Sequence, residues 1–419
     1  MFKRIISVSL AVLMGIVFAG CSAQEPVQED SNNADNVAYI NKVGETAPLS
    51  IRNNDPKIMS SSQYDNRYSE ANNDFAVVMT NAMEEGWTGV YSPLSLQIAL
   101  QILALGGDDD TSADLLNAVC PGLTRAEVNA STARLIDMLV KSKGVSVNSA
   151  VISNNAYRVC MQFANDAADY YLASVGALDF GDPAAALAEI NGWIEKNTDG
   201  LVKGLLDRVG PDTVLVILNA LTLKLNWKTP FTAMRETMNF TDSKGESQPV
   251  SVMKLVADLE YGKFEEGQMV VLPYEGDEYA MALILPTEGV TPREAAAALM
   301  GRYDECVNMS VSVKMPKVEV DTRLDILGMA DKLNIESGVH GKFPNLVGDD
   351  NVTVTVIRQG AYLSVTESGT TAAAATAIVA SKGIAFSEVD LVIDRPFAMV
   401  IYNVETGTVL FVSLVNSLG

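Results

Sequence analysis

Side chains that carry out covalent or metal chemistry are scarce in this chain. Its 419 residues include one histidine, His340, and four cysteines. One histidine excludes a multi-histidine metal centre and makes any Ser-His-Asp or Cys-His pair depend on His340. That residue lies in the glycine-flanked stretch SGVHGKF, and the sequence contains no GxSxG, HExxH, CxxC or GxxxxGKS/T motif. We interpret His340 as a loop residue and keep a hydrolase built on it as an alternative.

The acidic run Asp108–Asp110 follows two glycines. Three carboxylates would repel a phosphate, which excludes a phosphate cradle at this position. We interpret the run as a solvated loop before a helix N-terminus, where negative charge is favoured, and keep a calcium site as the alternative. We otherwise expect no metal and no cofactor. The net charge of −22 argues against a nucleic-acid partner, because nucleic-acid binding needs a basic face.

The most unusual composition follows Glu367, in the stretch ESGTTAAAATAIVASKGIAFSEVDLVID. Gly369 can act as a backbone pivot, and residues 370–377 are only threonine and alanine. Alanine favours a helix, and low complexity favours a plain flexible loop. Neither interpretation explains why small residues are followed by an apolar mixture that contains one lysine, Lys382.

Helix and strand patterns surround this segment. Apolar residues at helical spacing predict helices over residues 72–85 and 92–105, the second begun by an N-cap serine and a first-turn proline. An unbroken apolar run over 213–227 predicts a strand buried on both faces. Further strands are predicted over residues 269–274, 279–286, 307–320, 361–367, 398–404 and 408–415. Helices precede strands and no linker interrupts residues 71–419, so we predict a single α+β domain there.

The N-terminus resembles a bacterial lipoprotein signal. A positively charged start precedes the apolar stretch 5–18, and two small residues stand before Cys21. The stretch is shorter than the roughly 20 apolar residues that span a membrane. The resemblance implies that residues 1–20 are a signal peptide, that Cys21 is lipidated, and that the protein is anchored in the bacterial cell envelope, at the outer membrane on its periplasmic or its outer side. The polar residues 21–70 are predicted to be a flexible tether.

If Cys21 carries lipid, three cysteines remain: Cys120, Cys160 and Cys306. Because three is an odd number, at least one of them is unpaired, and the sequence predicts no disulfide framework. We interpret the three as small core residues.

The sequence from Glu367 onward closely resembles the hinge of the serpins, the serine-protease inhibitor family, in the pattern E-x-G-T-x-A-A-A-A-T. Four further segments resemble serpin motifs: VYSPLSLQIAL at 90–100, ILNALTLKLNW at 217–227, VVLPYEGDEYAMALILP at 270–286 and DRPFAMVIYNVETGTVLFVSLVNS at 394–417. The resemblance covers residues 72–419. One departure is Gln359, because many serpins carry a histidine on the strand before the hinge.

The resemblance implies an α+β serpin-like fold, with helices clustered around three β-sheets and an exposed reactive-centre loop. It implies an irreversible suicide inhibitor of serine endopeptidases, with papain-like cysteine proteases as further targets, rather than an enzyme. A target protease cuts the loop and forms a covalent acyl-enzyme, and the cut loop then inserts into the central sheet and traps it. The inhibitor is expected to be a metastable monomer. The alternative is a non-inhibitory relative that binds a ligand or partner.

The hinge residues of this resemblance are Glu367, Gly369, Thr370, Thr371, Ala372, Ala373, Ala374, Ala375 and Thr376. An inserting strand sends alternate side chains into the core, and small side chains enter without overpacking. We therefore expect an inward set of Thr370, Ala372, Ala374 and Thr376.

Counting along the loop from Glu367, the resemblance places the reactive bond at Gly383–Ile384. Cleavage at Lys382–Gly383 or at Ala385–Phe386 is the alternative. The resemblance also implies a switch region formed by Ser92, Ser95, Asn219 and Trp227, which Gln359 is expected to alter.

Overall fold

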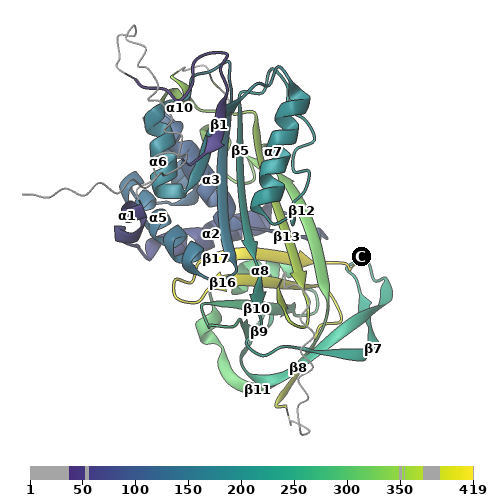
Figure 1. Ribbon diagram of the computed structural model, residues 1–419. Coiled ribbons are helices and arrows are strands. Elements are labelled where there is room, and N and C mark those ends of the chain that lie inside the picture. Colours follow the sequence, from purple (N-terminus) through teal and green to yellow (C-terminus); the bar gives the residue numbers. More distant parts are fainter. Residues whose placement is uncertain (1–36, 52–55, 349–351, 353, 371–386, 419) are drawn as a thin grey trace, which may run out of the picture. The chain divides into compact units, whose positions relative to one another are not determined.

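The computed structural model describes residues 37–51, 56–348, 352, 354–370 and 387–418. These residues belong to one compact unit that begins at Val37. Helices lie mainly in the first half of the chain and strands in the second, which confirms the predicted α+β class (Figure 1).

Ten α-helices lie in the described residues: α1 (Pro56–Ser61), α2 (Arg67–Ala82), α3 (Pro93–Gly106), α4 (Asp109–Val119), α5 (Arg125–Lys141), α6 (Met161–Tyr171), α7 (Pro183–Asn197), α8 (Pro292–Leu299), α9 (Glu336–Val339) and α10 (Pro344–Val347). Short 3-10 turns cover Tyr303–Glu305 and Leu327–Met329. Helix α3 is buried along its whole length, as its nearly unbroken apolar sequence requires.

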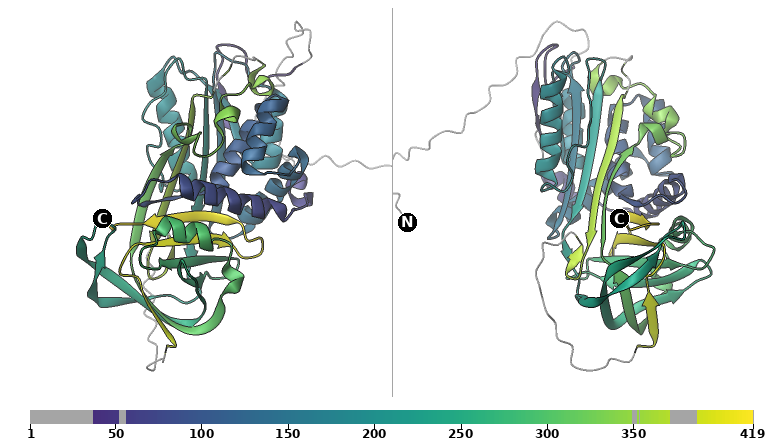
Figure 2. Two further views of the ribbon diagram at one scale, coloured as in Figure 1. Left: turned by 180° about the vertical axis from the view of Figure 1, so that it is seen from behind. Right: turned by 90° about the vertical axis from the view of Figure 1, so that its right-hand side faces the viewer.

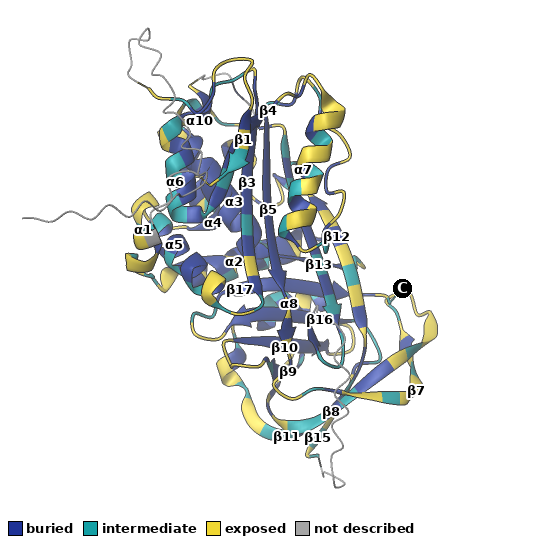
Figure 3. Ribbon diagram, in the orientation of Figure 1, coloured by how far each residue is buried: buried dark blue, intermediate teal, exposed yellow. Residues whose placement is uncertain are grey.

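The larger helices pack around an eight-stranded sheet, called the central sheet below. Its order is β1 (Ala47–Ser50), β4 (Ala173–Leu178), β3 (Val145–Asn154), β5 (Leu215–Leu223), β13 (Val356–Val365), β14 (Gly369–Thr370) and β6 (Leu225–Asn226), and β12 (Val318–Asp325) pairs with β13. Seen edge-on, the central sheet has α7 on one face and the group around α3 on the other (Figure 2). Because helices cover both faces, β5 is buried at every position (Figure 3).

The second sheet has nine strands. Its order is β15 (Val389–Val392), β11 (Val307–Pro316), β8 (Ser247–Lys263), β9 (Gly267–Pro273), β10 (Tyr279–Pro286), β16 (Phe397–Asn403), β17 (Val409–Val415) and β2 (Gly89–Tyr91), and β7 (Thr232–Thr241) pairs with β8. We expected three sheets in all, and the described residues form two. The reason is β8, which pairs with β7, β11 and β9 along its length and so joins their strands into one sheet.

Residues 37–51 and 56–70 belong to the compact unit and so differ from the flexible tether predicted for residues 21–70. Residues 37–50, called the N-terminal strap below, lie against the β3–α6 connection, and the side-chain amide of Asn41 donates to the Tyr157 carbonyl oxygen at 2.9 Å. Ile40 and Ala47 are buried in the strap, and Met59 is buried in α1. Apolar residues spaced this widely give no periodicity, so the sequence alone did not reveal the packing. In the described ranges, no helix is long and apolar enough to cross a membrane.

Candidate functional site

The described end of the predicted hinge is a short strand inside the central sheet. β14 pairs on one side with β13, where Thr370 lies opposite Val365, and on the other side with β6, where Thr370 lies opposite Leu225. Thr370 is completely buried. Gly369 is required beside it, because an added Cβ would lie 2.0 Å from the Leu225 carbonyl oxygen. The residues 371–386 that follow lie outside the described residues.

Next to β14, the central sheet is partly open at the boundary between β5 and β13, which we call the joint. β5 and β13 run parallel and pair only from Val216 and Val356 to Asn219 and Gln359. Beyond that pair, β13 next meets β14 at Val365, and in the described part of the chain β5 and β13 are not paired over the intervening residues. The unpaired edges of β5 (residues 220–223) and β13 (residues 360–364) can therefore accept the residues that follow Thr370 as a strand between them.

An aromatic pair lies under β14. The hydroxyl groups of Tyr274 and Thr370 share a hydrogen bond, and burial raises the pKa of Tyr274 well above its ordinary value. The Trp227 ring stacks on the Tyr274 ring with a centroid distance of 4.5 Å, and its indole N–H donates to the Thr366 carbonyl oxygen at 2.9 Å. Trp227 therefore contacts both the turn before the hinge and the tyrosine that binds Thr370.

The turn between β13 and β14 is fixed at Glu367. Its carbonyl oxygen accepts from the backbone N–H of Phe231 at 2.9 Å, and its carboxylate lies 2.7 Å from the Lys317 ammonium. Glu367 is about one quarter exposed in its side chain, at 23%. The predicted hinge thus starts from an anchored residue, so movement of the segment after Gly369 does not require β13 to move.

The predicted switch residues meet beneath the joint between β5 and β13. The Ser92 side chain caps α3 by accepting from the Ser95 N–H at 3.1 Å, and the Ser95 hydroxyl donates to the Asn219 side-chain oxygen. The Asn219 side-chain amide in turn donates to the Ser149 hydroxyl at 2.7 Å. The N-terminus of α3 is therefore linked by hydrogen bonds to β5 and through it to β3.

Gln359 completes these connections from the other side of the joint. Its side-chain amide donates to the Ser92 carbonyl oxygen at 2.7 Å, and its side-chain oxygen accepts from the Ser92 N–H at 3.1 Å. Gln359 and Asn219 are also direct partners in the β5–β13 pairing. We call Ser92, Ser95, Ser149, Asn219 and Gln359 the latch. All five are buried, and together they connect β5 and β13 through α3.

Sequence reasoning found part of this site. The sequence indicated Ser92, Ser95, Asn219, Trp227 and the hinge, and the structure places the first four and the described hinge residues Glu367, Gly369 and Thr370 along the boundary between β5 and β13. Sequence reasoning missed Tyr274 as the partner of Thr370, and Ser149 as the partner of Asn219. Neither pairing has a local sequence signal, because each joins strands far apart in the chain.

Several predicted features lie outside the described residues: the signal peptide 1–20, Cys21, the hinge residues after Thr370, and the bond Gly383–Ile384 with its alternatives Lys382, Ala385 and Phe386.

The other chemistry-bearing residues are placed as follows. His340 lies at the surface, 3.4 Å from the Glu336 carboxylate. Asp108 caps α4 by accepting from the Thr111 N–H, and hydrogen bonds from the Thr111 side chain and backbone lower the pKa of the Asp108 carboxyl group. The acidic run thus lies at a helix N-terminus, where negative charge is favoured. Cys120 is buried, and burial raises the pKa of its thiol to about 12. Within the described ranges no group of three His, Cys, Asp or Glu side chains is arranged as metal ligands.

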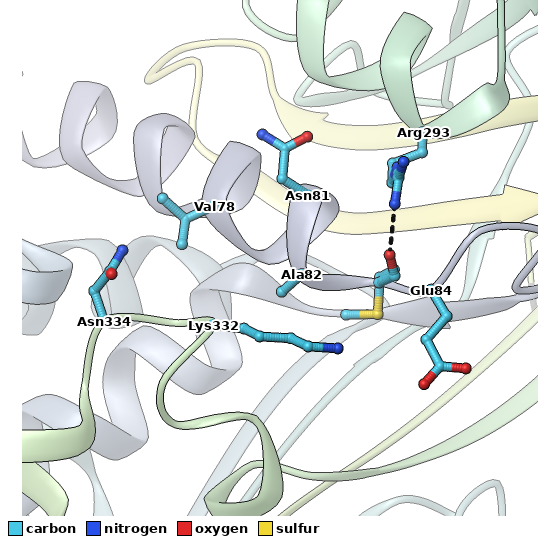
Figure 4. A pocket seen from close by; sticks show the side chains of 8 residues that line it. Val78, Asn81, Ala82, Glu84, Arg293, Lys332 and Asn334 are labelled. Atoms are coloured by element: carbon cyan, nitrogen blue, oxygen red, sulfur yellow. Dashed lines mark hydrogen bonds between the residues drawn. The ribbon is translucent and has the colours of Figure 1, made fainter.

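A surface groove of about 560 Å³ lies between the end of α2, the start of α8 and the loop at Lys332 (Figure 4). The Arg293 guanidinium group donates to the Met83 carbonyl oxygen at 2.9 Å and so satisfies a carbonyl at the C-terminal end of α2. None of the residues that line the groove belongs to the hinge or the latch.

Comparisons with known proteins agree with this geometry. The chain is 28% identical over 368 residues to a protein described as an uncharacterized serpin-like protein of Methanosarcina acetivorans, covering 83% of this chain and 85% of that one. It is 27% identical to human neuroserpin, covering 83% and 90%. The fold matches thyroxine-binding globulin in complex with thyroxine with a TM-score of 0.74 and 23% identity, covering 84% and 99%. The family model for serpins (serine protease inhibitor) matches residues 70–418, and the chain therefore belongs to the serpin family.

Proposed function

We propose that this serpin inhibits serine endopeptidases irreversibly, by inserting its cut reactive loop into the central sheet while the protease is still bound as an acyl-enzyme. Family members are generally protease inhibitors rather than enzymes. The observation that carries the proposal is the pairing of Thr370 with strands on both of its sides. Papain-like cysteine proteases are a second target class of the same mechanism.

The registers of β14 agree with continued insertion. If the antiparallel pairing of β14 with β13 is continued one residue at a time, the residues after Thr370 run along the open part of the joint. Continuing the pairing of β14 with β6 gives the same path along β5. Both extensions place Thr376 between Gln359 and Asn219, and these two residues are each other's partners in the sheet as it stands. The inserting strand would therefore reach the latch without a shift in register on either side.

The side-chain pattern fits the same path. Along β13, the positions that share a face with Val365 are Leu363, Ala361 and Gln359, and all are buried. The inserted residues opposite them would be Ala372, Ala374 and Thr376, which are small enough to enter without overpacking. About ten new backbone pairs, at roughly 0.5–1.5 kcal/mol net each, would contribute on the order of 10 kcal/mol. The uncut molecule would then be kinetically trapped.

The location of the inhibitor belongs to the same proposal. Cys21 carries the lipid, residues 22–36 connect it to the compact unit, and the inhibitor acts as a monomer at the bacterial cell envelope. Acyl chains bind a membrane by burying methylene groups, which contributes about 0.8 kcal/mol for each. Mass spectrometry of the membrane-extracted protein tests this point, because the lipidated chain would begin at Cys21 and carry the mass of its acyl groups.

The mechanism is tested by a matched pair of variants. Trypsin cleaves after lysine and can attack Lys382, while elastase and subtilisin cover the alternative bonds. We expect the wild type to form a complex that survives SDS. Thr370→Glu places a charge at a position of the central sheet that is completely buried, and this charge is expected to prevent insertion of the cut loop. The variant is therefore expected to be cleaved as a substrate without complex formation.

The control is Thr371→Glu. The same register puts residue 371 between Ser364 and the exposed Lys224, so a carboxylate there faces solvent and the complex is expected to form as in the wild type. A stable complex with Thr370→Glu would refute insertion. If the wild type itself is cleaved by every protease of the panel without a complex, the non-inhibitory alternative is correct.

A further inference from the structure

The two outer strands at the ends of the central sheet are very different in charge. β12 has the sequence VEVDTRLD and carries four exposed charged residues: Glu319, Asp321, Arg323 and Asp325. β4, at the opposite end before β1 is added, has the sequence ASVGAL and carries no charge. Charged side chains on an edge strand oppose pairing with another chain, and an uncharged edge invites it. β12 is thus protected by its own sequence, whereas β4 is not.

The N-terminal strap covers the unprotected edge. β1 pairs antiparallel with β4, with Ala47 opposite Ala177 and Ser50 opposite Val175. The strap is held before this point by the backbone N–H of Ile40, which donates to the Val159 carbonyl oxygen at 2.9 Å, and by the Arg158 guanidinium group, which lies 4.1 Å from the Tyr39 ring centre. The pairing of β1 with β4 is short and irregular in register. It is less extensive than the pairing of β4 with β3 or of β3 with β5.

The strap crosses β4 at a glycine. A Cβ on Gly176 would lie 2.8 Å from the Ala47 carbonyl oxygen and 3.0 Å from the Leu49 backbone nitrogen. All three of the atoms nearest to that position belong to the strap backbone. Gly176 therefore leaves room for the strap and for nothing else, and a side chain at this position is a selective means of displacing it.

We infer that β4 is an edge strand that can pair with another chain and that the strap covers this edge. When the strap is displaced, the strand that pairs with β4 in its place is β4 of a second copy of this chain. An uncharged strand can pair antiparallel with itself about a twofold axis, because no like charges meet across the axis. Main-chain hydrogen bonds to an exposed edge supply the affinity. The inferred pairing uses the end of the sheet opposite to β12 and does not involve the joint between β5 and β13. It does not depend on the inhibitory function.

The test displaces the strap with Gly176→Val in the full chain. Hydrogen exchange of the amides of Ala47, Leu49 and Ser50 is expected to become fast, and sedimentation is expected to shift from monomer to dimer as the protein concentration is raised. Adding Ser174→Lys to this variant places a lysine on the edge of each copy and is expected to restore the monomer while residues 47–50 stay unprotected.

Gly192→Val is the matched control, because Gly192 lies in α7 with no atom within 4 Å of an added Cβ, and it should remain monomeric with a protected strap. Leu49→Asp is a second way to loosen the strap, since Leu49 packs against the apolar cluster under α7. Circular dichroism checks that each variant is folded. A folded variant with an unprotected strap that stays monomeric overturns the inference, and so does a Gly176→Val protein whose strap remains protected.

Discussion

Thr370 is a polar residue in a fully buried position, so its hydroxyl group needs a partner, and that partner is the Tyr274 hydroxyl. Sequence alternation predicted that Thr370 faces inward. It could not predict Tyr274, because Tyr274 directly follows β9 of the second sheet while Thr370 lies in the central sheet, and only the fold brings them together. The same holds for Gln359: the sequence identified it as a departure from the usual histidine, but its paired bonds to the Ser92 backbone depend on where α3 begins.

The first prediction concerns this hydroxyl pair. Tyr274→Phe leaves the buried Thr370 hydroxyl without its partner, which costs about 1–3 kcal/mol. β14 should then leave the sheet more readily, so we expect faster hydrogen exchange at the Thr370 amide and a change in the fluorescence of Trp227, whose ring stacks on residue 274. Combining Tyr274→Phe with Thr370→Val removes both polar groups and should restore slow exchange. Equal exchange rates in the wild type and in Tyr274→Phe would contradict this role of the hydroxyl pair.

At the scale of elements, the long apolar runs were predicted well. The run over 92–105 became α3, and the strands expected over 269–274, 279–286, 398–404 and 408–415 became β9, β10, β16 and β17. The run over 213–227 divides into β5 and the short β6, and the stretch 307–320 divides into β11 and β12, which lie in different sheets. The strap and β1 were not predicted, because their few apolar residues are separated by polar ones and are ordered by contacts with α6 and β4. The number of sheets was wrong because pairing of one long strand, β8, with three neighbours cannot be inferred from alternation alone.

Asn219 makes two side-chain hydrogen bonds within the latch, one with Ser95 and one with Ser149, and their roles can be tested separately. The Ser95 hydroxyl ties α3 to Asn219 on β5, whereas Ser149 and Asn219 lie on β3 and β5, which remain paired when the joint opens. Ser95→Ala should therefore speed spontaneous insertion of the uncut loop, seen as a faster loss of complex-forming capacity at 37 °C. Ser149→Ala should lower stability by about 1–3 kcal/mol without this acceleration. If both variants lose activity at the same rate, the latch does not act across the joint.

At the scale of the whole molecule, the proposed inhibitor must store free energy in a sheet that can still accept a strand. The closed part of the β5–β13 joint is short and held by the latch, while the open part already contains β14 at its end. Most of the described chain supports this arrangement. Helices cover both faces of the central sheet (Figure 2), and Tyr274, which follows β9 of the second sheet, binds the hinge residue Thr370. In the proposed mechanism the nucleophile is the serine of the protease, and this chain contributes the sheet that traps it.

The last prediction follows from this stored free energy. Cleavage of the loop by a metalloprotease such as thermolysin, which forms no acyl-enzyme and so cannot be trapped, should let the segment after Thr370 insert and complete the sheet. About 10 kcal/mol of added stability corresponds, for a domain of this size, to an upward shift of the melting temperature on the order of 10 °C. Differential scanning calorimetry before and after cleavage measures the shift, and the cut Thr370→Glu variant should gain little because its hinge carries a charge that cannot be buried. A cut wild-type protein that melts at the same temperature as the intact one would mean that the loop does not enter the sheet, and this serpin would then be assigned to the non-inhibitory alternative.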